Sequence, residues 1–116
     1  MKQLDAINEV PLQRTYHIVF STYYRHPMLM QAEHKQAITN WIAEIAEQKA
    51  IKILEYKVLT DHVHILLVKQ SGQLLPQLIQ SIKGITTHYF FETYPEMKKE
   101  SGKGRLWNRG YNETLI

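Results

Sequence analysis

The 116-residue sequence predicts an α+β fold, in which an antiparallel sheet carries two helices on one of its faces. Three observations predict this class. Two segments repeat apolar residues at the spacing of an amphipathic helix, four segments have the length and alternation of strands, and two of those strands are joined by a very short turn. The predicted helices and strands follow one another closely enough to share one small domain.

The first half of the chain predicts a strand, a helix and a second strand. Thr15–Thr22 places large apolar residues at alternate positions, as a half-buried strand does. Pro27 restricts His26 to an extended backbone, which marks a connection. Gln31–Lys49 repeats apolar residues at i, i+3, i+4 and i+7, which is typical of an amphipathic helix. Ile51–Leu59 then predicts the second strand.

The third predicted strand carries the most informative residues of the sequence. Thr60 and Asp61 form a tight turn, so the segment Asp61–Val68 is expected to pair antiparallel with the strand before it. Side chains alternate between faces, so His62 and His64 point the same way, roughly 7 Å apart along the strand. Two imidazoles so placed can converge on one metal ion or one phosphate, although ordinary surface or core histidines produce the same pattern.

The second half of the chain predicts a helix over Leu75–Thr93, a Lys/Gly-rich loop over Pro95–Arg105 and a final strand over Leu106–Ile116 that begins irregularly. Gly84 lies inside the helix at a cost of about 1 kcal/mol relative to alanine, so either another group approaches the backbone there or the glycine is merely tolerated. The order β-α-β-β-α-β, with two crossovers interleaved around a hairpin, is the ferredoxin-like arrangement with both helices on one face.

Composition limits the class of protein. Hydrophobic residues make up 44% and charged residues 22% of the chain, which is typical of a globular domain rather than of disorder. We divide the chain into a polar N-terminal extension, residues 1–14, and one domain, residues 15–116. The formal charge of +3 permits a polyanionic partner. The chain has no cysteine, signal peptide or membrane-length apolar run, which together favour a cytoplasmic location.

Basic and aromatic residues provide candidate contacts to nucleic acid. Aromatic rings beside arginine offer stacking and phosphate contacts to single strands, whereas a solvated basic fringe is the plainer explanation of the same residues. The candidates are Tyr23, Tyr24, Arg25, Lys83, Arg105 and Arg109. The remaining histidines (His17, His26, His34 and His88) are expected to be structural or surface residues, and Trp107 is expected to anchor the last strand.

Four segments in order resemble the single-tyrosine HUH transposases, the small enzymes of the insertion-sequence 200/605 kind and their REP-associated relatives. The segments are 16–22 with Arg25 and Pro27, the strand with His62 and His64, residues 81–85 of the second helix, and residues 106–111. The resemblance implies a DNA transposase that cuts single-stranded DNA beside a hairpin. A tyrosine hydroxyl would attack the scissile phosphate to leave a 5′-phosphotyrosine, and a free 3′-hydroxyl would later reverse the bond.

The resemblance also implies a metal cofactor and a partner subunit. His62 and His64 would hold a divalent ion, Mg²⁺ or Mn²⁺, that polarises a phosphate oxygen, and two imidazoles suit Mn²⁺ at least as well as Mg²⁺. The family implies a homodimer with composite active sites. The face that carries the histidines also carries Leu66 and Val68, and we expect it to lack a cover, which also favours self-association.

The sequence departs from the family in one respect. In the family, the nucleophilic tyrosine and usually a third metal ligand lie on a helix after the last strand, whereas this sequence stops at Thr114–Ile116. We therefore expect a C-terminal truncation relative to the family and an inactive chain, because none of the seven tyrosines matches the nucleophile position. Two alternatives stay open: a catalytically inactive DNA-hairpin-binding remnant, and an unrelated ferredoxin-like metal or ligand sensor.

Overall fold

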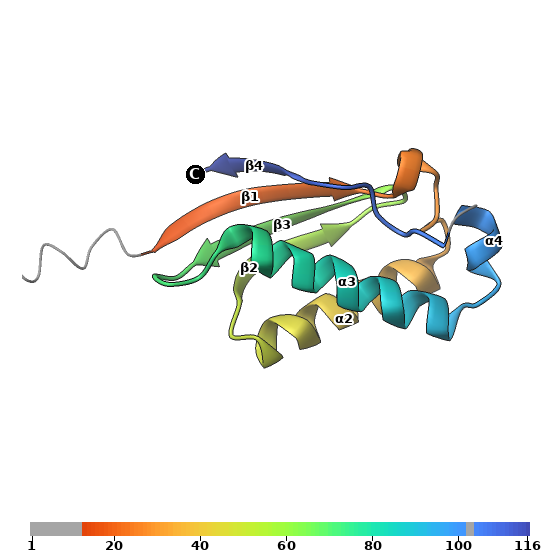
Figure 1. Ribbon diagram of the computed structural model, residues 1–116, viewed down its shortest axis with the longest axis horizontal. Coiled ribbons are helices and arrows are strands. Elements are labelled where there is room, and N and C mark those ends of the chain that lie inside the picture. Colours follow the sequence, from red (N-terminus) through yellow and green to blue (C-terminus); the bar gives the residue numbers. More distant parts are fainter. Residues whose placement is uncertain (1–12, 102–103) are drawn as a thin grey trace, which may run out of the picture.

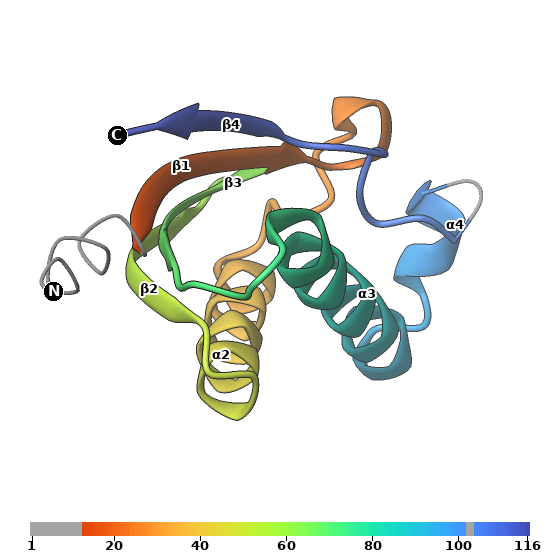
Figure 2. The same cartoon turned by 60° about the vertical axis from the view of Figure 1, so that its left-hand side comes forward.

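A four-stranded antiparallel sheet is built from the residues that the computed structural model describes, 13–101 and 104–116 (Figure 1). The strands are β1 (Arg14–Ser21), β2 (Lys52–Val58), β3 (His62–Lys69) and β4 (Asn112–Leu115), in the order β2-β3-β1-β4. The two long helices are α2 (Ala32–Gln48) and α3 (Leu75–Thr93), and both lie on the same side of the sheet (Figure 2). The predicted class and the ferredoxin-like order are confirmed. Of the predicted polar extension, residues 1–12 lie outside the described residues.

The core lies between the sheet and the two long helices. In β3, Val63, Ile65 and Leu67 are fully buried, and in β1 the residues with the same orientation are Ile18 and Phe20. Each such aliphatic or aromatic side chain contributes about 1.5–3 kcal/mol when fully buried. The strand alternation therefore directs the apolar set of β3 toward the helices and leaves its histidines on the other face, here called the outer face.

The helices bury the apolar stripes that predicted them. Ile38, Ile42 and Ile45 of α2 are at most 1% exposed, and α3 contributes Ile79, Ile82, Phe90 and others. Pro76 lies in the first turn of α3, where its missing N–H has no helical partner to lose. His34 of α2 is also buried and packs against Phe90 and Tyr94, which gives this histidine a structural position, as expected. Its Nδ1 has no hydrogen-bond partner.

The last predicted strand is shorter than expected. Only Asn112–Leu115 forms β4, because the preceding segment is diverted from the ladder. Gly110 has a φ of +74°, and its carbonyl and that of Asn108 accept hydrogen bonds from the Lys83 ammonium at 2.7 and 2.8 Å. Trp107 still meets the end of β1 through an isolated bridge to Thr22, and its indole N–H donates to Thr86 Oγ1 at 3.0 Å. This buried tryptophan anchors the segment, as expected.

Two further expectations need correction, and one of the two explanations left open for Gly84 is excluded. The segment Pro95–Arg105, expected to be a loop, contains the short helix α4 (Met97–Ser101), whose first turn follows Pro95. A side-chain Cβ at Gly84 would meet no atom within 4 Å, so close approach of another part of the described chain does not explain this glycine. Val68, expected on an uncovered face, is only 6% exposed.

Within the described residues, no helix has both the length and the apolar character needed to cross a lipid bilayer.

Candidate functional site

The two histidines of β3 lie together on the outer face of the sheet. His62 and His64 alternate with the fully buried residues of the strand, and both are half-buried. Their ring centroids are 4.9 Å apart, with the planes inclined at 64°. The side chain of His62 is 22% exposed, so the pair is accessible from solvent. This geometry matches the prediction that the two imidazoles share one face.

Each imidazole of the pair has a hydrogen-bond partner at its Nδ1. His62 Nδ1 lies 2.7 Å from Asp61 Oδ1, and His64 Nδ1 lies 2.9 Å from His17 Nε2. His17 reaches His64 from the neighbouring strand β1, where it pairs with Leu66 across the ladder. With both Nδ1 atoms engaged, Nε2 is the nitrogen that each ring has left to bind an ion.

The surroundings of the pair favour a neutral His64 and an ionised Asp61. The hydrogen bond from His62 lowers the pKa of Asp61 below its ordinary value, and Arg25 acts in the same direction. Burial lowers the pKa of His64, and the charges of His62, His17 and Lys57 add to this effect. Metal ions bind the neutral form of histidine, so the lowered pKa keeps His64 in the form that a metal requires.

The donor set is compatible with a divalent metal. Histidine ligands commonly donate their second ring N–H to a carboxylate or another acceptor, which fixes the ring and its tautomer. His62 has such a carboxylate in Asp61. Among the residues that the structure describes, no three His, Asp or Glu side chains are grouped to hold a metal ion by themselves. A metal held by His62 and His64 would therefore need further ligands, such as water or phosphate oxygens.

The turn between β1 and α2 brings aromatic and basic residues close to this pair. Tyr23–Arg25 forms a short 3₁₀ turn, in which Tyr24 and Arg25 have φ values of +53° and +54°. Tyr24 is 81% exposed, and its ring lies 4.4 Å from that of Tyr23. The guanidinium Nε of Arg25 lies 3.5 Å from Asp61 Oδ2, so one carboxylate contacts both this turn and His62.

The segment 105–111 brings the other predicted basic residues to the same end of the sheet. The guanidinium of Arg105 lies 5.5 Å from the centroid of the Tyr23 ring, and the Asn108 side chain accepts a hydrogen bond from the Tyr24 backbone at 2.9 Å. Arg109 is exposed. Burial lowers the pKa of Lys83, and two of its three N–H donors are occupied by backbone carbonyls.

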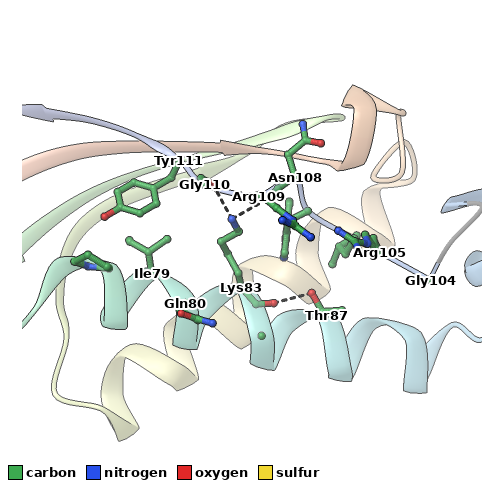
Figure 3. Close-up of a pocket in the computed structure, with 14 residues that line it drawn as sticks. Ile79, Gln80, Lys83, Thr87, Gly104, Arg105, Asn108, Arg109, Gly110 and Tyr111 are labelled. Atoms are coloured by element: carbon green, nitrogen blue, oxygen red, sulfur yellow. Dashed lines mark hydrogen bonds between the residues drawn. The ribbon is translucent and has the colours of Figure 1, made fainter.

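Two depressions lie on either side of this segment. The first, here called the α3 cleft, has a volume of about 570 Å³ between α3 and residues 104–111; Lys83 spans it while Arg105 and Arg109 lie along its wall (Figure 3). The second, here called the β1-edge groove, has a volume of about 780 Å³. Its lining includes Val19, Ser21, Tyr23, Tyr24, Arg105 and Arg109. Val19 and Ser21 are the ladder partners of His64 and His62, so this groove adjoins the histidine pair.

Most of the seven tyrosines lie away from the outer face. Tyr16 and Tyr56 pair in register with the helix-facing residues Leu67 and Ile65. Tyr89 packs against Trp41, Tyr94 packs against His34, and Tyr111 packs against the core. Burial raises the pKa of both Tyr94 and Tyr111, which disfavours the tyrosinate form. Tyr23 and Tyr24 belong instead to the turn whose Arg25 contacts Asp61, and with Tyr111 they line the β1-edge groove.

Two residues of this site were not singled out from the sequence. Asp61 was expected only as part of a turn, and His17 was expected to be structural or surface. The position of Asp61 directly before His62 was an available signal, since a carboxylate there can reach the ring. The alternation of β1 placed His17 on a face with Val19 and Ser21, but the register of β1 against β3 was needed to bring it to His64.

Fold and site together define a small α+β protein with a paired-histidine centre beside a basic groove. A family model described as "Transposase IS200 like" matches residues 12–114, and the chain belongs to this family. Family membership excludes the alternative of an unrelated sensor whose resemblance is accidental.

Individual relatives agree with this assignment. The ISDra2 transposase TnpA of Deinococcus radiodurans is 31% identical over 99 residues, which are 85% of this chain and 70% of that protein. The transposase for insertion sequence element IS200 of Salmonella typhimurium is 28% identical over 96 residues, covering 83% of this chain and 62% of that protein. The chain thus spans between three-fifths and three-quarters of the length of these relatives.

Solved structures show the same fold. A crystal structure of a transposase from Deinococcus radiodurans R1 superposes with a TM-score of 0.82 at 27% identity, covering 90% of this chain and 79% of that one. The structure of a REP-associated tyrosine transposase bound to a REP hairpin superposes with a TM-score of 0.65 at 18% identity. That match covers 89% of this chain and 56% of the other, and at this identity it supports the fold alone.

Proposed function

We propose that this IS200-like transposase chain provides the metal and DNA-binding part of a reaction that cuts and rejoins single-stranded DNA. The observation that carries the proposal is the pair His62 and His64, whose Nδ1 atoms are both engaged while the rings share the outer face beside a basic groove. Mg²⁺ or Mn²⁺ is the proposed cofactor, and single-stranded or hairpin DNA is the proposed partner.

The proposed chemistry needs a tyrosine and a charge-stabilising site. The tyrosine oxygen bonds to the scissile phosphorus as the bond from phosphorus to the 3′-oxygen breaks; the tyrosine loses its proton and the leaving 3′-oxygen gains one. Attack by a 3′-hydroxyl on the phosphotyrosine reverses the exchange and rejoins the strand. When bound, the ion supplies Lewis-acid stabilisation of charge on the phosphate oxygens. His62 and His64 would hold it, and Asp61 would orient His62.

The β1-edge groove is the proposed path of the DNA strand. Tyr24 offers an exposed ring for base stacking, and Arg105 and Arg109 offer two guanidinium groups to phosphates. Arg25 directly follows the groove residue Tyr24 and contacts Asp61, so it is available to a phosphate near the histidine pair. Lys83 retains one N–H donor for DNA and also holds residues 108 and 110, which form a wall of the groove.

DNA binding is expected to be strongly salt-dependent and to need the two arginines of the groove. Binding of a hairpin with a single-stranded flank should weaken in the Arg105→Ala/Arg109→Ala variant. The slope of log K against log salt should become shallower by roughly 1 to 1.5, because each phosphate contact on a single strand contributes about 0.7. Fluorescence anisotropy between low and moderate salt measures both quantities.

The matched control for this experiment removes the same charge elsewhere. Lys49 and Lys52 are exposed and lie at the opposite end of the strands from the histidine pair. The Lys49→Ala/Lys52→Ala variant should keep nearly the original affinity and slope. Equal losses in the two variants would show that net charge alone drives binding, and would overturn the proposed groove.

We also propose that the functional form is a homodimer. β4 is an edge strand whose residues are all exposed, and an unpaired edge can pair with a second chain. Sedimentation velocity is expected to show a two-fold increase in mass as the concentration rises into the high micromolar range. A monomer throughout that range would contradict this proposal without affecting the metal site.

A further inference from the structure

The contact between His17 and His64 has the geometry of a single, nearly linear hydrogen bond. The two nitrogens are 2.9 Å apart, and the ring planes differ by 17°. The ring centroids are 5.1 Å apart, which is close to the largest separation that this nitrogen-to-nitrogen distance allows. The rings therefore lie end to end rather than face to face, with the Nε2 lone-pair direction of one ring aimed at Nδ1 of the other.

Only one proton fits between these two nitrogens, and its assignment decides what His64 can do. A neutral imidazole carries one N–H, so His64 can offer a lone pair at Nε2 only if its proton is on Nδ1. His64 Nδ1–H then donates, and His17 Nε2 accepts. The opposite assignment, with His17 donating, would place the His64 proton on Nε2 and block that atom as a ligand.

We infer that His17 is a positioning residue of the proposed metal site, whose Nε2 accepts the His64 Nδ1–H and thereby keeps the lone pair of His64 Nε2 available to the ion. This inference rests on the proposed function of His62 and His64. His17 acts on His64 as Asp61 acts on His62, so each ligand has an acceptor behind it. His17 belongs to β1, and the β1–β3 ladder holds the two backbones in register.

The tautomer of His64 provides a test that needs neither metal nor catalysis. Long-range ¹H–¹⁵N correlation spectra of the metal-free chain distinguish a protonated from an unprotonated ring nitrogen. The expected result is a protonated Nδ1 on His64 in the original chain, and a shift of the proton toward Nε2 in the His17→Phe variant. A His64 that is protonated on Nε2 in the original chain would overturn the inference.

Metal affinity provides the second test, by calorimetry with Mn²⁺. The His17→Phe variant should bind Mn²⁺ about 10-fold more weakly, the low end of the effect of removing an outer-shell partner. The His17→Gln variant, whose side-chain carbonyl can accept the same N–H, should recover most of the affinity. The control His88→Phe alters an exposed histidine of α3 and should bind as the original chain does.

The outcomes separate this inference from the function on which it rests. If the original chain binds no Mn²⁺, the proposed metal site fails. If it binds Mn²⁺ and His17→Phe binds equally well, the metal site stands and the role of His17 is overturned. Should His17→Phe fail to fold, the tautomer of His64 in the original chain and the Mn²⁺ affinity of His17→Gln still decide the question. A folded His17→Gln variant that binds Mn²⁺ much more weakly than the original chain also counts against the inference.

Discussion

Replacing both His62 and His64 by alanine is expected to abolish Mn²⁺ binding by this chain. The two rings share the outer face and are the only proposed protein ligands, so no imidazole remains at the site in the double variant. Each single variant should weaken binding by more than about 10-fold, because a ligand contributes at least as much as the outer-shell group that orients it. Isothermal titration calorimetry at neutral pH measures the effect.

The control for this experiment removes two other histidines. His26 and His88 have side chains that are 45% and 69% exposed, and each lies within 3.7 Å of a glutamate rather than beside His62. The His26→Ala/His88→Ala variant should bind Mn²⁺ normally. Circular dichroism should show that the His62→Ala/His64→Ala variant is folded, since neither histidine belongs to the buried core. Retention of Mn²⁺ binding in the folded double variant would place the metal elsewhere.

Incubation of the 116-residue chain with labelled hairpin DNA and Mn²⁺ is expected to yield no covalent protein–DNA adduct. Four of the seven tyrosines pair in register with helix-facing residues or pack against the helices. Tyr111 lines the β1-edge groove, but it packs against the core and burial raises its pKa, which disfavours the nucleophilic tyrosinate. Tyr23 is engaged in the contact with Arg105, and Tyr24 extends into solvent. In-line attack requires a precisely held hydroxyl, since a misplacement of about 1 Å can cost about 100-fold in rate, and an exposed ring in a turn is not held in this way. Denaturing electrophoresis measures the result.

This experiment has a positive control and a defined contrary outcome. Photocrosslinking of the same mixture should produce a slowly migrating band, which demonstrates that the DNA was bound and that an adduct is detectable. A covalent band without irradiation would contradict the prediction. Loss of that band in Tyr23→Phe, Tyr24→Phe or Tyr111→Phe, the three tyrosines that line the groove, would then identify the nucleophile. Binding without an adduct would favour the alternative that these 116 residues act as a DNA-hairpin-binding unit.

The periodicity of the sequence was sufficient to predict the elements and their inner faces. A helix buries one stripe every 3.6 residues and a strand buries alternate residues, so local spacing alone distinguishes the two. The predicted helix Leu75–Thr93 agrees with α3 at both ends, and the fully buried Val63, Ile65 and Leu67 are those expected from alternation. The shared face of His62 and His64 follows from the same rule, because it depends only on neighbours within one strand.

Features that depend on contacts between distant segments were decided only by the tertiary structure. The irregular segment before β4 is held by Lys83 from another element, and no local pattern at residues 106–111 encodes that contact. The register of β1 on β3 brings His17 to His64, across 47 residues of sequence. Register is set by the summed packing of whole strands against the core and by ladder hydrogen bonds, rather than by any single residue. The sequence by itself therefore determined the two candidate ligands, whereas only the tertiary structure brought His17 into contact with one of them.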